Sequence, residues 1–313
     1  MKIGLLLPTR EAVLAEDPHP GPLLELAERA EAAGFDSVWV GDSLLARPRF
    51  EPMTLLAAVA ARTQRVELGT AVLVAPLRNP VLLAHSAATV DQIARGRLIL
   101  GLGFGPPGPR TEMEFAAAGA IYEKRAGRMG EWMEVCRRLW TGEEVSYAGK
   151  HWSLDKAVLA PRPTRPGGPP LWVGGNGPTS MRIAGRYGDG WLPNDPDLEV
   201  LRAHWRAIQA EAPAGRDPVL AYYGTVNVGP DAAQAQRELE AFIQRYYGLP
   251  YARISAHQGC VAGTVDTCAA WLGEKVALGV AHLVLRLASD DQAGQFQRVV
   301  TELLPRLREL RPA

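Results

Sequence analysis

The stretch VELGTAVLVAPLRNPVLLAHSAATVDQIARGRLILGLGFG, residues 66–105, holds one complete strand–helix–strand unit. Residues 66–74 and 97–105 are short apolar runs rich in Val and Leu, which is the composition of parallel strands buried on both faces. Residues 79–96 between them show the spacing of a helix. This unit therefore predicts a parallel sheet whose strands are joined by helices.

The same alternation of strand-like and helix-like runs continues along the 313 residues. It gives eight expected strands, and almost every one is followed by a helix. This number and order of elements is typical of a (β/α)₈ or TIM barrel. A doubly wound open sheet is the alternative. The other expected strands are 2–8, 37–42, 170–175, 190–194, 219–229 and 282–288, and the other expected helices are 21–34, 51–63, 123–142, 178–188, 197–212, 231–248, 263–279 and 290–310.

Two parts of the chain interrupt this alternation. Residues 106–170 are expected to form an insertion, with an irregular Pro- and Gly-rich part at 106–122 and a small hairpin at 145–155. A long loop is expected around residues 248–262. With these additions, residues 1–313 are expected to form a single barrel domain.

The amino-acid composition argues against several classes of binding partner. Thirty-four basic residues balance thirty-four acidic ones, and no basic block stands out, so neither nucleic acid nor a membrane is expected as a partner. Cys136, Cys260 and Cys268 form no C-x-x-C motif, which fits a reducing cytoplasm, and no metal site is expected. The N-terminal apolar run is too short for a signal peptide and is expected to be the first strand.

The active site of such a barrel lies at the C-terminal ends of its strands. Asp42 follows the second strand and shares one side of it with Val38 and Val40, because side chains alternate along a strand. If the valines fill the barrel, Asp42 points into its mouth; a turn or a helix cap is the alternative. The run Gly-Leu-Gly-Phe-Gly at 101–105 is followed by prolines instead of the helix of a dinucleotide fingerprint. We expect its glycines to let a large planar ligand approach the backbone closely, because glycine has no side chain.

The stretch VGGNGPTSM, residues 173–181, follows the fifth strand. Its glycines allow a tight turn, and the helix that starts at Pro178 offers free N–H groups and the positive end of a helix dipole. The Asn, Thr and Ser side chains can add donors. The stretch predicts a phosphate site, with a ligand-free turn as the alternative. Together the strand ends predict a flat ligand with a phosphate tail.

Five stretches carry a resemblance to known proteins: AERAEAAGFDSVWVGDS, VELGTAVL, RNPVLLAHSAATVDQIARGRLILGLGFG, LWVGGNGPTSMRIAGRYGDGWLP and AGTVDTCAAWL. Together they resemble the luciferase-like family of flavin-dependent oxidoreductases over nearly the whole chain. The resemblance implies a (β/α)₈ barrel with insertions that binds either FMN or the deazaflavin coenzyme F420. Both ligands are flat tricycles with a phosphate on a sugar-alcohol chain.

The resemblance also implies which residues hold the cofactor. Thr70, Ala71 and Val72 should back one face of the ring, and the deazaflavin branch carries a non-prolyl cis peptide here, near Ala71–Val72. Gly103 and Gly105 should pass near the ring or the ribityl chain. The phosphate is expected at Gly174, Gly175, Asn176, Gly177, Pro178 and Thr179.

Two departures from the family pattern leave the acid–base partner unassigned. Deazaflavin members often have Asp-His after the second strand, with the His near the reacting carbon, where this chain has Asp42 and Ser43. Some members place a Glu after the fourth-strand glycines, where this chain has prolines; Glu112 and Glu114 come several residues later. Asp42 and Ser43 are therefore the catalytic candidates, and Asp42 is also expected at the cofactor.

Other residues are expected on the substrate side. His19 lies in the loop after the first strand, and Tyr251 and His257 lie in the loop before the last unit. Loops above a barrel mouth often act as lids. Arg286 at the end of the last strand, like Arg78 after the third, could reach a phosphate, with a surface salt bridge as the alternative.

The leading interpretation is an oxidoreductase that transfers a hydride between F420 and a small organic substrate. The GGNGP turn and Asp42 favour the deazaflavin over FMN. One alternative is an FMN-dependent monooxygenase that uses O₂ and reduced flavin from a partner flavin reductase. Another is a flavin-binding protein without turnover. The family resemblance also implies a homodimer.

Overall fold

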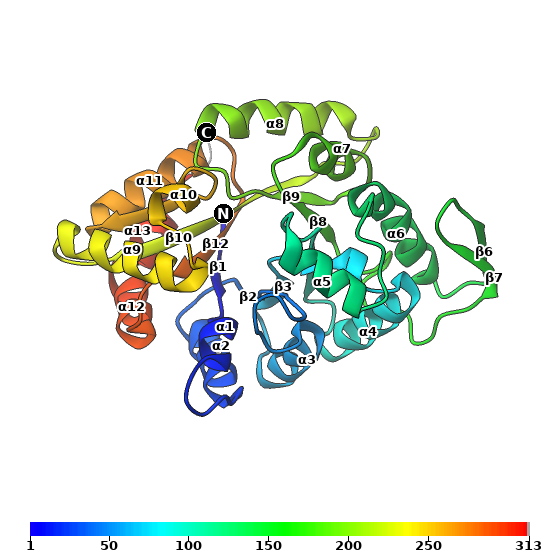
Figure 1. The fold of residues 1–313 in the computed structure, drawn as a ribbon, viewed down its shortest axis with the longest axis horizontal. Helices are drawn as coiled ribbons and strands as arrows, with labels where there is room; N and C mark the ends of the chain where they lie inside the picture. Colours follow the sequence, from blue (N-terminus) through cyan, green and yellow to red (C-terminus); the bar gives the residue numbers. More distant parts are fainter. Residues whose placement is uncertain (312–313) are drawn as a thin grey trace.

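Eight parallel strands close into a barrel in the computed structural model, which describes residues 1–311 (Figure 1). Each strand pairs with the next, and the last pairs with the first. The predicted TIM barrel is thus confirmed. In order, the strands are β1 (Lys2–Leu6), β2 (Ser37–Val40), β3 (Glu67–Thr70), β5 (Leu98–Gly103), β8 (Leu171–Gly174), β9 (Gly190–Leu192), β10 (Val219–Val228) and β12 (His282–Leu287).

Two short strands complete the sheet. The predicted strand 66–74 is divided into β3 and β4 (Leu73–Val74), and both halves pair with β5. β11 (Cys260–Gly263) pairs with β10 at Thr225–Val228, beyond the part of β10 that pairs with β9. The expected loop 248–262 therefore ends in a strand, which extends the sheet above β9.

Helices surround the barrel and connect its strands (Figure 1). Several begin with a side-chain cap, such as Asp231 on Gln234 N–H and Thr264 on Thr267 N–H. None of the helices within residues 1–311 is long and apolar enough to cross a membrane. The predicted helices appear as α2 (Gly21–Ala32), α3 (Pro52–Arg62), α4 (Pro80–Ile93), α6 (Arg125–Leu139), α7 (Pro178–Tyr187), α8 (Leu198–Glu211), α9 (Ala232–Tyr247), α11 (Val265–Ala277), and α12 (Gln292–Arg298), which continues through a π-helical turn (Val299–Leu303) into α13 (Leu304–Glu309).

Four short helical segments fall where the sequence indicated loops or strand. They are α1 (Thr9–Val13), a 3₁₀ turn (Ala75–Leu77), α5 (Pro109–Ala117) and α10 (Tyr251–Ser255). The Pro- and Gly-rich composition of residues 106–122 concealed α5. Proline is compatible with the first turn of a helix, where its missing N–H needs no partner, so Pro109 begins α5 instead of preventing it.

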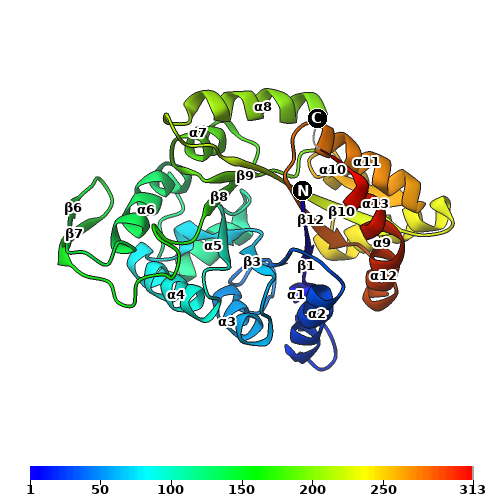
Figure 2. The same cartoon turned by 180° about the vertical axis from the view of Figure 1, so that it is seen from behind.

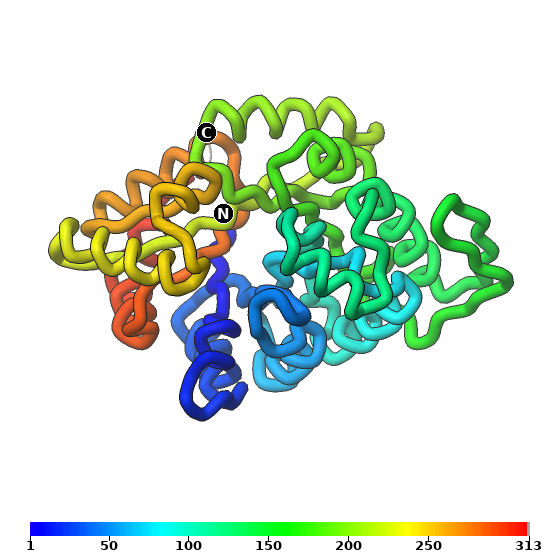
Figure 3. Tube along the Cα trace, viewed as in Figure 1, coloured from blue at the N-terminus to red at the C-terminus, as the bar shows by residue number. Residues whose placement is uncertain are grey.

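The insertion between β5 and β8 contains the predicted hairpin. β6 (Val145–Ala148) and β7 (Ser153–Ala157) pair antiparallel and project from the barrel beside α6 (Figures 1 and 2). The chain trace in Figure 3 shows this hairpin as an outlying excursion from the ring of strands and helices. The insertion thus adds to the outside of the barrel.

On β2, the side chain that points into the barrel is the one between the two valines that were expected there. Trp39 packs inside with Ile99 and Trp172, whereas Val38 and Val40 pack against the surrounding helices. The expected inward orientation of the two valines is wrong. Strands buried on both faces are apolar at every position, so the sequence does not reveal which side faces inward.

A buried polar chain lies at the N-terminal end of the barrel. His282 Nε2 lies 2.7 Å from Ser37 Oγ, and Trp39 Nε1 donates to the same oxygen at 2.7 Å. Burial lowers the pKa of His282 to about 3, with Lys2 and the N-terminal amine adding to the effect. The imidazole is therefore neutral in the folded protein at physiological pH.

This depressed pKa predicts a loss of stability in mild acid. An unfolded His binds a proton below pH ~6.5, whereas folded His282 does not until about pH 3. The contribution of His282 is thus fully present above pH ~6.5 and falls by about 2 kcal/mol between pH 7 and 5. Urea unfolding at both pH values should show a smaller decrease for His282→Gln than for the wild type. Equal decreases would contradict the assignment of a neutral buried His282.

Candidate functional site

The C-terminal ends of the strands surround a cavity of about 400 Å³, the mouth cavity. Seven residues expected at the cofactor line it: Asp42, Ala71, Val72, Gly103, Gly105, Gly174 and Gly175. The structure therefore brings together segments that are up to 133 positions apart, from Asp42 to Gly175. Further lining residues were not expected from the sequence, among them Arg47, Arg49, Tyr223, Tyr246, Tyr247 and Gln258.

Val72 forms one wall of the mouth cavity. The Ala71–Val72 peptide bond is cis, as the resemblance implied, and it separates β3 from β4. A Cβ atom on Gly103 would lie 2.4 Å from Val72 Cγ2, and one on Gly174 would lie 2.9 Å from Val72 Cγ1. These two glycines are therefore needed to accommodate Val72, which presents an apolar surface to the cavity. Both glycines also line the mouth cavity, and the expectation that Gly103 passes near a bound ring stays a prediction.

Asp42 holds this wall in place. Its Oδ2 accepts from the backbone N–H of Val74 at 2.8 Å and from Arg78 Nη1 at 2.6 Å, and its Oδ1 accepts from Arg78 Nη2 at 3.0 Å. The Asp42 side chain is 1% exposed and that of Arg78 is 20% exposed. Both carboxylate oxygens are thus occupied, and Arg78 is committed to an ion pair.

The turn after β8 leads from the mouth cavity to the start of α7. Gly175 has φ +101°, a conformation that favours glycine. Gly177 occupies the N-cap position without a side-chain cap, so N–H groups in the first turn lack intrahelical acceptors. Asn176 Oδ1 is buried and has no hydrogen-bond partner among residues 1–311, and its Nδ2 donates to Asn194 Oδ1 at 3.4 Å. Pro178 and Thr179 follow on α7 and do not line the mouth cavity.

A cluster of arginine and tyrosine side chains forms another wall. The Arg286 guanidinium lies 4.5 Å from the Tyr246 ring centroid and 5.4 Å from that of Tyr247. Arg286 Nη1 donates to Tyr247 Oη at 3.0 Å, and Arg49 Nη2 donates to Tyr246 Oη. Arg286 is 3% exposed, and its Nε and Nη2 have no acceptor within residues 1–311. The mouth cavity thus has a buried cation with unused donors.

Tyr223 projects into the same part of the barrel. It belongs to the inward-facing set of β10 and lines the mouth cavity. Burial raises the pKa of Tyr223 strongly, although Arg286 and Arg49 oppose the rise. Its hydroxyl is therefore protonated at neutral pH and can donate a hydrogen bond.

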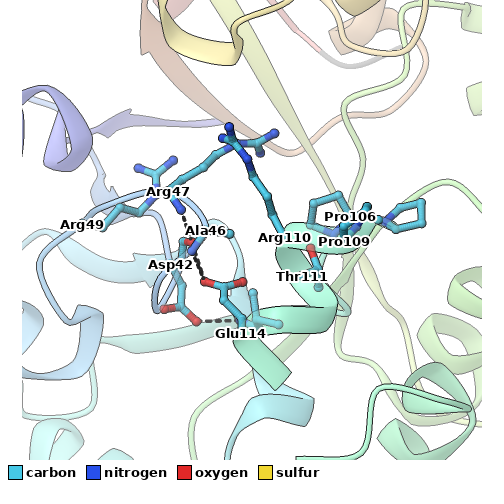
Figure 4. Close-up of a pocket in the computed structure, with 13 residues that line it drawn as sticks. Asp42, Ala46, Arg47, Arg49, Pro106, Pro109, Arg110, Thr111 and Glu114 are labelled. Carbon is cyan, nitrogen blue, oxygen red and sulfur yellow. Dashed lines mark hydrogen bonds between the residues drawn. The ribbon is translucent and has the colours of Figure 1, made fainter. Parts of the chain in front are cut away.

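A second cavity of about 480 Å³, the outer cavity, lies between the loop after β2 and the start of α5 (Figure 4). Glu114 on α5 is 3% exposed and fastens that loop. Its Oε1 accepts from Ser43 Oγ at 2.7 Å and from the N–H groups of Leu45 and Ala46 at 2.7 and 2.9 Å. Although burial opposes it, these hydrogen bonds lower the pKa of Glu114. Ser43 is therefore tied to a carboxylate instead of facing the mouth as a free hydroxyl.

Several expected site residues lie elsewhere. Thr70 is buried and donates to Gly101 O at 2.8 Å without lining the mouth cavity. His19 is exposed and accepts from Gly21 N–H at the start of α2. His257 is exposed, and Tyr251 on α10 packs against the α9 cluster. The structure does not bring His19, Tyr251 or His257 to the mouth cavity.

The residues that the sequence missed carried weak signals. Tyr223 and Arg286 are polar groups within apolar strands, and the sequence indicated for Arg286 only a contact with a phosphate or a surface salt bridge. Tyr246 and Tyr247 are the last two residues of α9. Arg49 lies in the loop after β2, between Pro48 and Phe50. Tyr246, Tyr247 and Arg49 reach the mouth cavity only because α9 and this loop fold over the end of the barrel.

Comparisons with known proteins agree with this geometry. Residues 1–282 match the family described as luciferase-like monooxygenase. A protein of Nakamurella multipartita named F420-dependent glucose-6-phosphate dehydrogenase is 38% identical over 57% of this chain, a match that spans only 53% of that relative. One of Beutenbergia cavernae with the same name is 33% identical over 94% of this chain and 95% of its own length. The structure of the monooxygenase RslO1 from Streptomyces bottropensis is 26% identical, with a TM-score of 0.82, and covers 97% of this chain and 99% of its own.

The contacts of Asp42 predict a structural effect of its removal. Asp42→Asn should lower the free energy of unfolding by about 2–3 kcal/mol, because it leaves a mostly buried Arg78 without its carboxylate partner. Glu51 is the matched control, since it lies 3.4 Å from Arg78 but is 46% exposed. Glu51 also caps α3 by accepting from Thr54 N–H, and Gln keeps an acceptor there, so Glu51→Gln should change stability by less than about 1 kcal/mol. Urea denaturation would measure both, and equal effects would show that Asp42 does not hold the wall.

Proposed function

The chain belongs to the luciferase-like monooxygenase family, and on that premise we propose that it transfers a hydride between the deazaflavin F420 and a small organic substrate. The observation that carries the proposal is the wall at Val72, where the side chain packs against Gly103 and Gly174 and presents an apolar surface beside the glycine-rich turn before α7. The names of the relatives, F420-dependent glucose-6-phosphate dehydrogenases, support the choice of F420.

The residues around the mouth cavity fit this cofactor. Val72 would back one face of the ring, with Ala71, Gly103 and Gly105 alongside. The phosphate would lie at the turn from Gly174 to Thr179, where first-turn N–H groups of α7 are free to bind it. The glycine-rich turn thus has donors that the fold itself does not use.

When bound, the deazaflavin ring supplies the centre that accepts or gives the hydride. The protein contributes position and polarity. Tyr223 would donate a hydrogen bond from its protonated hydroxyl to a substrate oxygen, and Arg286 would place positive charge beside it. Asp42 and Ser43, the catalytic candidates from the sequence, would serve as positioning residues, because Asp42 fixes the Val72 wall and Ser43 fixes its loop through Glu114.

Binding of F420 and of FMN to the purified protein tests this proposal. Titration followed by F420 fluorescence should show a Kd for F420 at least tenfold below that for FMN. The loaded protein should then be assayed for F420 reduction with glucose 6-phosphate, the substrate in the relatives' name, and with a panel of alcohols. Tighter binding of FMN than of F420 would reject the proposal.

The second candidate is an FMN-dependent monooxygenase that uses O₂ and a partner flavin reductase. The similarity to the monooxygenase RslO1 at 26% identity favours it. Oxygen uptake coupled to substrate oxygenation, together with preferential FMN binding, would establish this candidate in place of the first.

The phosphate turn yields a prediction that separates binding from folding. Gly177→Asp should weaken F420 binding at least tenfold, because it places a carboxylate where the phosphate would lie. Stability should be unchanged or slightly higher, since Gly177 has extended backbone angles, space for a Cβ, and an N-cap position that Asp favours. Fluorescence titration and thermal unfolding would measure the two effects.

Gly177→Ser is the matched control, because it caps the helix without adding charge. A second control is the deazaflavin fragment that ends at the ribityl chain and lacks the phosphate. Gly177→Asp should not change the affinity for this fragment. Unchanged F420 affinity in Gly177→Asp would remove the phosphate from this turn.

A further inference from the structure

We propose that the substrate extends from the mouth cavity into the outer cavity and carries an anionic group, a phosphate or carboxylate, that Arg47 and Arg110 bind there. This inference rests on the proposed function, because the hydride transfer would take place in the mouth cavity. It adds a substrate class, an elongated organic anion, and two residues that select it.

The two cavities adjoin each other. Both are lined by Asp42, Arg47, Arg49, Val74 and Pro106. Their volumes are about 400 and 480 Å³, so the outer cavity is at least as large as the mouth cavity. A substrate confined to the mouth cavity would leave the outer cavity filled only with water.

The outer cavity is lined by positive charge that the protein does not neutralise. Arg47, Arg49 and Arg110 line it, and none of them forms an ion pair within residues 1–311. The two carboxylates in the lining are already used. Asp42 is paired with Arg78, and Glu114 accepts three hydrogen bonds from the loop after β2.

Arg47 and Arg110 have guanidinium groups available to a ligand. The Arg47 guanidinium lies 5.1 Å from the Tyr247 ring centroid and makes no side-chain hydrogen bond within residues 1–311, and Arg110 is exposed at the start of α5. Figure 4 shows both side chains at the outer cavity, Arg47 from the loop after β2 and Arg110 from the start of α5. Guanidinium groups bind phosphate and carboxylate in a bidentate manner, so this pair is suited to an anion.

The neighbouring arginines make an anion still more favourable. Arg10 and Arg49 lie over the Tyr246 ring at 4.6 and 5.7 Å. Burial lowers the pKa of Arg10, and the nearby charges of Arg49 and Arg47 lower it further. Like charges gathered at a partly buried site repel one another, and a bound anion would offset that repulsion.

The test compares two probes with the same naphthyl ring, of which only one carries a phosphate. 1-Naphthyl phosphate and neutral 1-naphthol would be titrated into apoprotein and into F420-loaded protein. The wild type should bind the phosphate at least tenfold more tightly than the naphthol. In Arg110→Gln and in Arg47→Gln/Arg110→Gln this ratio should fall toward one. Arg206→Gln is the control, because Arg206 is exposed on α8 and forms no ion pair with any of residues 1–311, and it should keep the wild-type ratio.

Three results would overturn the proposal. A ratio near one in the wild type would show that no anion subsite exists. A ratio lost in Arg286→Gln but kept in the Arg47 and Arg110 variants would place the anion in the mouth cavity. A loss of F420 affinity in these variants, with no change for F420 lacking its glutamate tail, would assign the arginines to the cofactor tail.

The design also separates this inference from the proposed function. Failure of F420 to bind would reject the proposed cofactor, whereas the probe ratio in apoprotein would still report on the arginines. Because the Arg110 side chain is exposed, Arg110→Gln should fold normally, and its thermal unfolding would verify this.

Discussion

The packing of one valine constrains the whole active end of this barrel. Val72 follows the cis bond that interrupts the third strand, and its two methyl groups occupy the space where Gly103 and Gly174 would otherwise carry side chains. Asp42 holds the segment beyond it through Val74 N–H and Arg78. Four strands therefore meet at this wall, and a larger residue at either glycine would displace it.

The opposite wall has a different chemistry. Arg49 and Arg286 are set among Tyr223, Tyr246 and Tyr247, whose rings and hydroxyls stabilise the guanidinium groups without neutralising them. A buried charge without a counter-ion is costly to the fold, so its presence in a cavity indicates a function. The mouth thus has an apolar face suited to a flat ring and a cationic face suited to an anionic molecule.

The carboxylates near the mouth are engaged in structure. Asp42 fixes the Val72 wall, and Glu114 fastens the loop after β2 with three hydrogen bonds. Proton-donating groups that face the mouth cavity are therefore hydroxyl and guanidinium groups. This arrangement suits an enzyme in which a cofactor carries the redox chemistry and the protein supplies hydrogen bonds and charge.

The sequence by itself predicted eight parallel strands covered by helices, because buried parallel strands are apolar throughout and alternate with amphipathic helices. The count of eight favoured a closed barrel over an open doubly wound sheet. The sequence also predicted the glycine-rich turn before α7 from a local motif, whereas the cis bond at Ala71–Val72 was implied by the family resemblance. The tertiary structure alone decided that Trp39 faces inward in place of Val38, because both sides of a buried strand are apolar. It alone brought Arg49, Tyr246 and Arg286 together, because this contact depends on how a loop and the end of α9 fold over the barrel mouth.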